Sequence, residues 1–457
     1  MTSPGAATGL GASPWAGGRW TWLRTPDRRL LLLAVLVQAA LVLLSVRASF
    51  DTRVFGAAGY LVGTGHSPYL TLNLRPVFHA FLYADLPAIG YPPPWPLLLG
   101  GIYRATYALV PNLALYDAAM KLPAVAAGVA LAYLTGAALQ NLGASPAVVR
   151  RAWVALLFNP LVLFVGAAWG QIDAIVALLA LAALLLVASG RRDLSAVTLA
   201  LAVCVKPTAA PLLLAVLLLV GISSVPRALR YAAVFLAGAF AFYVLPFLLL
   251  GWDAAPVRTA NAQFSMAGAL SLAAVPHPWL EPLVLQGHWW LLGLLWAPAL
   301  VIAAGVALSA GRVRRDFAGL LTLSLTLTLV FFLCRAWLSE SNVVLALAPA
   351  LILGALDRID RRLFTALWAV ALAFTVANAS PVFLLWVVSP GATEHALAVV
   401  RSHSEVTLGI RAVLAVAWQF VEWWTVAACL RRPRVAVAAP AVAVGTTAAG
   451  PAREALP

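Results

Sequence analysis

Residues 172–189 read IDAIVALLALAALLLVAS, an apolar stretch whose one charged residue, Asp173, stands near its start. About 20 apolar residues in an α-helix cross the ~30 Å hydrocarbon layer of a bilayer. Comparable stretches recur along the chain, which is 63% hydrophobic and 10% charged, whereas about a quarter of the residues of a soluble protein are charged. The sequence therefore predicts an all-α polytopic membrane protein.

We expect roughly 11–13 membrane-spanning helices. The apolar stretches lie near residues 30–48, 152–169, 172–189, 194–205, 208–222, 231–250, 289–308, 317–334, 343–356, 363–388 and 407–429. Two further stretches, 92–110 and 115–140, pose a problem of parity, because two ordinary crossings would place Arg150 and Arg151 outside. Either one of them is re-entrant or lies on the surface, or the count of spans is wrong.

Short basic clusters between the spans predict the orientation of the chain. They include Arg150-Arg151, Arg191-Arg192, Arg227/Arg230, Arg312/Arg314/Arg315, Arg358/Arg361/Arg362 and Arg431/Arg432/Arg434. Such clusters favour the cytoplasmic side and face anionic lipid headgroups. They lack interleaved aromatic residues, so the net charge of +14 indicates membrane lipids rather than nucleic acid as the partner.

This orientation divides the chain into an integral membrane domain, 24–432, between Gly/Ala/Pro-rich tails at 1–23 and 433–457 that we expect to be disordered and cytoplasmic. The outer loops are 49–91, 251–288 and 389–406. All six histidines fall in these outer segments, so any chemistry is expected on the extracytoplasmic side.

The first outer loop carries an ordered set of motifs. It contains Asp51 near its start, then Gly65-His66-Ser67-Pro68-Tyr69, then Gly90-Tyr91-Pro92-Pro93-Pro94. Asn159-Pro160, Trp169-Gly170-Gln171-Ile172-Asp173, Lys206-Pro207-Thr208 and Arg335-x-Trp337-x-Ser339-Glu340-x-Asn342 follow. Over about residues 30–360 the chain resembles the GT-C superfamily of lipid-phosphosugar-dependent glycosyltransferases, and family 87 most closely. Its Asp51-Thr52 departs from the Asp-Glu of the protein-mannosylating branch.

The resemblance implies a GT-C-like helical bundle with a long first outer loop, in the plasma membrane. It also implies transfer of a sugar from a polyprenyl-phosphate donor, with mannose the first choice and arabinofuranose the second. The acceptor would be a glycolipid or a cell-envelope polysaccharide.

Asp51 is the candidate catalytic base, because inverting transfer needs a group that takes the proton of the acceptor hydroxyl. A phosphate leaves without protonation, so a second carboxyl group is unnecessary, unlike in glycosidases. Alternatively, Asp51 caps an interfacial helix beginning at Thr52. Asp85 and Asp173 are the reserve candidates.

Lys206 and Arg335 are the candidates for holding the donor phosphate. Lys206 stands between apolar runs, where an ionisable side chain is by default a functional candidate, although it could instead snorkel to an interface. A guanidinium matches phosphate geometry, although Arg335 could instead pair with Glu340. The remaining donor-binding candidates are Glu340, Asn342, His288, Gln171 and Tyr69, and for His288 an interfacial-belt role is the alternative. Lys121 is expected to form a helix pair with Asp117.

No Asp-x-Asp motif for a metal–diphosphate complex is present, so we expect no required cofactor, although a divalent cation could assist. His395 and His403 lack the spacing of a zinc site. Two other functions stay open, a transporter or lipid flippase and a non-catalytic subunit of an envelope-assembly complex. The sequence gives no indication of oligomeric state.

Overall fold

The computed structural model describes residues 27–46, 49–71, 73–80, 83–84, 86–253, 268–271, 295–309, 316–335, 337–378, 382 and 389–431. Both predicted disordered tails, most of the loop 251–288 and the basic cluster Arg312/Arg314/Arg315 lie outside these residues. Within them the protein is almost wholly helical, and its one sheet pairs β1 (Gly268–Ala269) in parallel with β2 (Trp337–Leu338).

The helices follow the predicted spans closely. In chain order they are α1 (Arg28–Leu44), α2 (Phe50–Gly63), α3 (Arg75–Phe78), α4 (Pro94–Ala105), α5 (Leu113–Asn141), α6 (Pro146–Leu157), α7 (Pro160–Leu163), the π-helix η2 (Phe164–Trp169), α8 (Asp173–Ala188), α9 (Arg192–Val205), the 3₁₀ turn η3 (Pro207–Ala209), α10 (Pro211–Ser223), α11 (Val225–Ala239), η4 (Phe240–Val244), α12 (Leu245–Leu250), α16 (Trp296–Ser309), α17 (Phe317–Leu333), the 3₁₀ turn η8 (Glu340–Val343), α18 (Val344–Ala355), α19 (Arg361–Ala377), α20 (Pro390–Ser402) and α21 (Ser404–Leu430).

Three continuous helices among the described residues, Leu113–Asn141, Val225–Leu250 and Ser404–Leu430, are long and apolar enough to cross a bilayer. The helices Pro146–Leu157 and Pro160–Trp169, bent by 42° relative to each other, meet the same criterion only when taken together. Shorter apolar helices, such as Asp173–Ala188 and Phe317–Leu333, pack among them. The prediction of an all-α polytopic membrane protein is confirmed.

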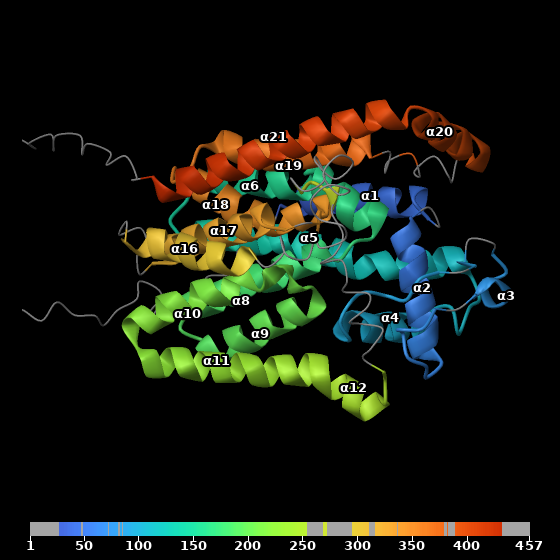
Figure 1. Ribbon diagram of the computed structural model, residues 1–457, viewed down its shortest axis with the longest axis horizontal. Coiled ribbons are helices and arrows are strands. Elements are labelled where there is room, and N and C mark those ends of the chain that lie inside the picture. The colour runs from blue at the N-terminus through green and yellow to red at the C-terminus, as the bar shows by residue number, and fades with distance from the viewer. Residues whose placement is uncertain are drawn as a thin grey trace, which may run out of the picture.

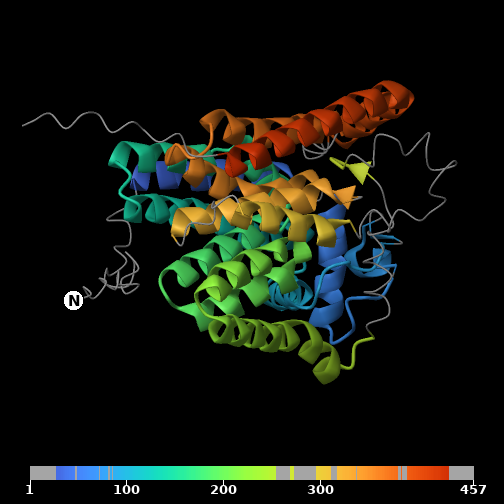
Figure 2. The ribbon, with the colours of Figure 1, turned by 60° about the vertical axis from the view of Figure 1, so that its left-hand side comes forward.

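Helix α2 lies across the direction of the main bundle. In Figures 1 and 2 it stands upright beside one end of the bundle, whose long helices α5, α11 and α21 run roughly along one another. Glycines let α4 approach α2 closely: a Cβ on Gly59 would lie 2.9 Å from the carbonyl oxygen of Leu99, and one on Gly100 would lie 2.7 Å from Cβ of Val62. Helices α2, α3 and α4 therefore form a layer at the end of the bundle.

The lengths of α4 and α5 bear on the question of parity. The 12 residues of α4 reach ~18 Å, well short of the membrane core, whereas the 29-residue α5 is long and apolar enough to cross it, which favours a single crossing between residue 94 and Arg150. The ends of α5 and α18 and the start of α17 share one cleft, lined by Asn141, Leu356 and Asp316 among others. We call this end of the bundle, which also carries Arg150 at the start of α6, the basic end, and the opposite end, beside α2, the site end.

Candidate active site

Asp51 lies in the first turn of α2 at the site end. The helix begins at Phe50 with Ser49 as its N-cap, and the Thr52 hydroxyl donates a 2.9 Å hydrogen bond to the Ser49 carbonyl. The alternative that Asp51 caps a helix beginning at Thr52 is wrong, because the helix starts two residues earlier. The carboxylate of Asp51 is thus free of capping and half-buried beside the positive end of the helix.

Trp169 is the partner that the structure brings to Asp51. Its indole Nε1 donates a 2.6 Å hydrogen bond to Oδ2 of Asp51. Trp169 ends the π-helix Phe164–Trp169, and such insertions of one residue into a turn occur frequently at functional sites. The preceding break arises at Asn159, whose side chain caps α7 by accepting from the amides of Leu161 at 3.0 Å and Val162 at 3.2 Å.

Gly170 ends this π-helix in the left-handed conformation, with φ +80°. A Cβ at this position would lie 2.7 Å from Cγ2 of Thr52 and 3.1 Å from Cγ of Lys121. The Gly of the Trp-Gly-Gln motif is therefore required both for backbone conformation and for space. It lets the chain pass directly over the start of α2.

Burial is the dominant influence on Asp51 and raises the pKa of its carboxyl group. Hydrogen bonds from Trp169 and Gln171 and the positive charges of Lys206 and Arg53 act in the opposite direction. Burial makes the carboxylate a stronger base, while these donors and cations keep the charged form accessible.

Lys206 forms an ion pair with Asp173 near Asp51. Its Nζ lies 2.7 Å from Oδ1 and 2.9 Å from Oδ2 of Asp173, and 13% of the lysine side chain is exposed against 2% of the aspartate. Lys206 ends α9 in an extended conformation and is followed by Pro207. Because Lys206 occupies both oxygens of Asp173, this reserve candidate is poorly placed to act as a base.

Tyr91 of the Gly-Tyr-Pro-Pro-Pro motif joins this cluster, although the motif alone does not mark it as a site residue. Its hydroxyl donates to Oε1 of Gln171 at 3.0 Å, and Nζ of Lys206 lies 5.9 Å from the centre of its ring. Tyr69 is 1% exposed and donates its hydroxyl to the Tyr91 carbonyl at 3.1 Å. Tyr69 therefore holds the backbone of Tyr91 in place by a hydrogen bond.

Arg335 follows α17 at the site end. Its Nε donates to the carbonyl of Trp337 at 3.0 Å, and its guanidinium carbon lies 5.4 Å from the centre of the Phe331 ring. Burial lowers the pKa of Arg335 to about 10, so the side chain still carries its charge at neutral pH.

Glu340 and Asn342 are buried in η8, with exposed fractions of 2% and 3%. Among the described residues, Oε1 of Glu340 and Oδ1 of Asn342 have no hydrogen-bond partner. Burial raises the pKa of Glu340 to about 7, opposed by a hydrogen bond from Asn378 and assisted by the negative charge of Asp51. The positive charge of Arg411 on α21 acts on the same carboxyl group.

Two predicted site residues, Asp85 and His288, lie outside the described residues. In the part of the chain that the structure does describe, no group of three or more His, Cys, Asp or Glu side chains is arranged to hold a metal ion. His395 on α20 is exposed.

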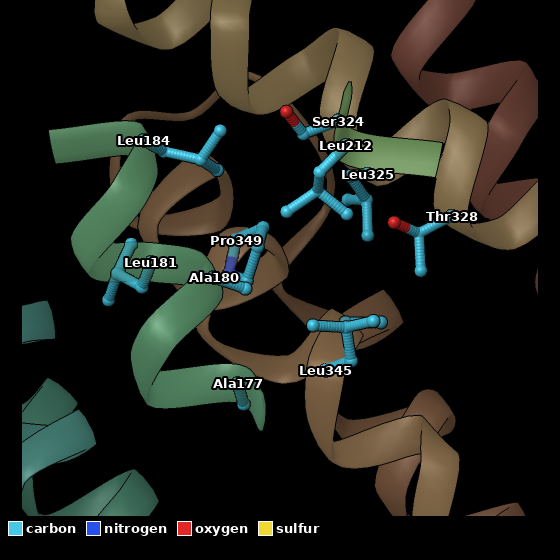
Figure 3. A pocket seen from close by; sticks show the side chains of 11 residues that line it. Ala177, Ala180, Leu181, Leu184, Leu212, Ser324, Leu325, Thr328, Leu345 and Pro349 are labelled. Atoms are coloured by element: carbon cyan, nitrogen blue, oxygen red, sulfur yellow. The ribbon is translucent and has the colours of Figure 1, made fainter. Parts of the chain in front are cut away.

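A small apolar cavity of about 10 Å³, the size of one water molecule, lies between α8, α10, α17 and α18 (Figure 3). Ala177, Leu212 and Leu345 are among the side chains that line it. These residues follow Asp173, Thr208 and Asn342 by four, four and three positions respectively. The cavity, which we call the apolar seam, therefore lies about one helical turn along the chain from these polar residues.

The family model for glycosyltransferase family 87 matches residues 91–339. No curated protein matches the chain. The family match begins at Tyr91 and includes Trp169, Gln171, Lys206 and Arg335, while Asp51 precedes it. Since it covers more than half of the 457 residues, the chain belongs to glycosyltransferase family 87, and it is a membrane glycosyltransferase.

Proposed function

We propose that the enzyme transfers a sugar from a polyprenyl-phosphate donor to a hydroxyl group of a glycolipid or cell-envelope polysaccharide, on the extracytoplasmic face of the plasma membrane. Mannose is the first choice of sugar and arabinofuranose the second, both from the family resemblance. The observation that carries the proposal is the hydrogen bond of 2.6 Å between Trp169 and Asp51. It fixes a half-buried carboxylate next to a lysine at the end of a membrane bundle.

In the proposed reaction Asp51 takes the proton of the acceptor hydroxyl. The acceptor oxygen forms a bond to the anomeric carbon while the bond from that carbon to the phosphate oxygen breaks, and its electron pair leaves with the phosphate. Oδ2 of Asp51 keeps its hydrogen bond from Trp169, and we assign Oδ1 to the proton. Attack from the face opposite the phosphate inverts the anomeric configuration.

Lys206 and Arg335 are assigned to the leaving phosphate. Both side chains bear donors at the site end, and positive charge placed where negative charge develops is the largest single contribution in many enzymes. The Lys206 side chain remains 13% exposed while paired with Asp173, so we assign its ammonium group to both the carboxylate and the phosphate. The seam lined by Ala177 and Leu345 is assigned to the start of the prenyl chain, which requires α8 and α10 to separate from α17 and α18.

Glu340 and Asn342 are assigned to sugar hydroxyls. Their buried acceptor oxygens lack partners among the described residues, and a buried acceptor left unpaired costs about 1–3 kcal/mol. A sugar, whose hydroxyl groups both donate and accept, would satisfy them. The charges of Asp51 and of Arg411 on α21 both affect the pKa of Glu340. We therefore place this sugar subsite between Asp51 and α21.

The test is transfer of radiolabelled mannose from polyprenyl-phosphomannose into lipid acceptors by membranes containing the wild type or Asp51→Asn. We expect transfer by the wild type only, with an inverted anomeric configuration in the product. Equal transfer by both would reject Asp51 as the base, and a retained configuration would reject the single-base scheme.

Transfer of neither mannose nor arabinofuranose by the wild type would overturn the proposed function and make a transporter or lipid flippase the next candidate. Of the alternatives from the sequence, family membership argues against a transporter or flippase, and the transfer assay distinguishes the enzyme from a non-catalytic subunit. The gathering of polar groups at one end of the bundle supports an enzyme over a conduit.

A further inference from the structure

A buried ion pair in α5 lies beside the Trp169–Asp51 hydrogen bond and has no part in the proposed chemistry. Lys121 is 0% exposed and Asp117 1% exposed, and Nζ lies 3.1 Å from Oδ2, which confirms the predicted helix pair. Removing two charges from water commonly costs more free energy than their attraction returns. Stability alone therefore does not account for this pair.

The lysine holds the end of α1. Its Nζ donates to both the carbonyl and the hydroxyl oxygen of Ser45, each at 2.8 Å. Ser45 is the C-cap of α1, and its hydroxyl donates to the Leu41 carbonyl at 2.7 Å and lies 3.4 Å from the carbonyl of Ala167 in η2. One ammonium group thus joins α5 to the helix end that precedes α2.

The aliphatic stem of Lys121 also supports the π-helix. A Cβ on Gly170 would lie 3.1 Å from Cγ and 3.4 Å from Cε of Lys121, and 2.7 Å from Cγ2 of Thr52. The residue that follows Trp169 is therefore enclosed between the lysine and the residue that follows Asp51.

We propose that Lys121 is a positioning residue, which holds the end of α1 and the end of η2 in the register that brings Trp169 and Asp51 within hydrogen-bonding distance. This inference rests on the proposed role of Asp51. A misplacement of about 1 Å can cost a hundredfold in rate. The buried contacts of Lys121 with Ser45 and Gly170 therefore affect kcat although Lys121 does not touch substrate.

Ser45→Ala is the first test, since it removes the hydroxyl that accepts from Lys121 and leaves the Lys121–Asp117 ion pair intact. The matched control is Ser195→Ala at the basic end. Ser195 is also 0% exposed, and its hydroxyl lies 2.7 Å from the Ala183 carbonyl and 3.0 Å from the hydroxyl of Tyr231. The two substitutions remove equivalent buried hydroxyls, one tied to the site and one remote from it.

We expect Ser45→Ala to lower kcat about tenfold, with little change in KM for the donor or the acceptor. The acidic limb of the pH–rate profile should also move to higher pH, because the Trp169 hydrogen bond lowers the pKa of Asp51. Ser195→Ala should leave kcat and the pH–rate profile unchanged. The double variant Lys121→Met/Asp117→Asn, which removes both charges together, should exceed Ser45→Ala in effect. The groups that act on Asp51 in these variants are Trp169, Gln171, Lys206, Arg53 and Glu340.

A second readout does not depend on activity. Protein labelled with 5-fluorotryptophan gives a ¹⁹F resonance for Trp169, identified by its loss in Trp169→Phe, and its titration with pH should disappear in Asp51→Asn. We expect this resonance to move in Ser45→Ala and in the double variant but not in Ser195→Ala. The positioning role would be overturned if Ser45→Ala and Lys121→Met/Asp117→Asn both kept the Trp169 resonance and the pH–rate profile of the wild type. Absence of transfer by the wild type would instead overturn the proposed function, and the ¹⁹F result would still decide the role of Lys121.

Discussion

The indole of Trp169 and the carboxylate of Asp51 are joined by a hydrogen bond of 2.6 Å across 118 positions of the chain. The bond unites the first motif of the sequence with the Trp-Gly-Gln-Ile-Asp motif. It fixes Oδ2 of Asp51, while Gln171 acts on the same carboxyl group.

Trp169→Phe removes this donor and keeps the aromatic ring. Since the hydrogen bond lowers the pKa of Asp51, its loss should raise that pKa, so that the base becomes protonated at higher pH and the acidic limb of kcat/KM moves upward. We also expect a fall of about tenfold or more in kcat. Trp153→Phe is the control, because Nε1 of Trp153 is buried without a partner among the described residues. Identical pH profiles for the two variants would contradict the role of Trp169.

Gly170→Ala should destabilise the protein through both strain and crowding. Gly170 has φ +80° and Gly190 has φ +79°, but only at Gly170 would a Cβ meet neighbours, whereas nothing lies within 4 Å of it at Gly190. Gly190→Ala therefore measures the cost of the left-handed conformation alone, about 1 kcal/mol. Thermal unfolding in detergent should show a clearly larger fall in unfolding temperature for Gly170→Ala than for Gly190→Ala. Equal falls would show that the side chains of Thr52 and Lys121 move aside at little cost in free energy.

Lys206→Met should raise KM for the lipid-phosphate donor at least about tenfold, because it removes a charged donor from the proposed phosphate site. The substitution also leaves Asp173 buried without its partner, so Lys206→Met/Asp173→Asn is needed to separate binding from folding. In the double variant we expect the stability to recover while the donor KM stays high. If the stability and the donor KM both returned to the wild-type values, Lys206 would serve only to pair with Asp173.

Asn342→Leu should reduce activity without reducing stability. Its buried Oδ1 has no partner among the described residues, and replacing an unsatisfied polar group by an apolar one of similar size is neutral or stabilising. Steady-state kinetics should show a raised KM for the sugar substrates that Asn342 contacts, with an unfolding temperature at or above that of the wild type. A less stable variant with unchanged kinetics would make Asn342 a structural residue.

The fold was largely predictable from the sequence because the hydrophobic pattern of membrane helices is strong. The predicted span 317–334 ends one residue after α17, and the span 343–356 extends one residue beyond α18 at each end. The role of residues 92–110 was left open, because an apolar helix that packs on another helix has the composition of one that faces lipid. The short length of α4 and the close contacts of Gly59 and Gly100 with neighbouring helices distinguish the two.

The candidate site was predictable in its members but not in its connections. Asp51, Lys206 and Gln171 were singled out by motif and by charge in an apolar setting. The ion pair of Lys206 with Asp173 and the hydrogen bond of Tyr91 to Gln171 depend on residues 33 and 80 positions apart, which no local pattern encodes. Tyr91 was quoted only as part of Gly-Tyr-Pro-Pro-Pro, and its position directly before the prolines was the available signal.

The bent span Pro146–Trp169 has a consequence for biosynthesis. A ribosome that has inserted α1 through α5 has already delivered Asp51 and Lys121 to the membrane, but Ala167, Trp169 and Gly170 have yet to emerge. Until they do, the carboxylate lacks its indole and the start of α2 has nothing packed above it. The nascent chain therefore passes through an interval in which Asp51 and Lys121 have reached the membrane without the indole that binds the carboxylate, and the arrival of this one broken helix ends that interval.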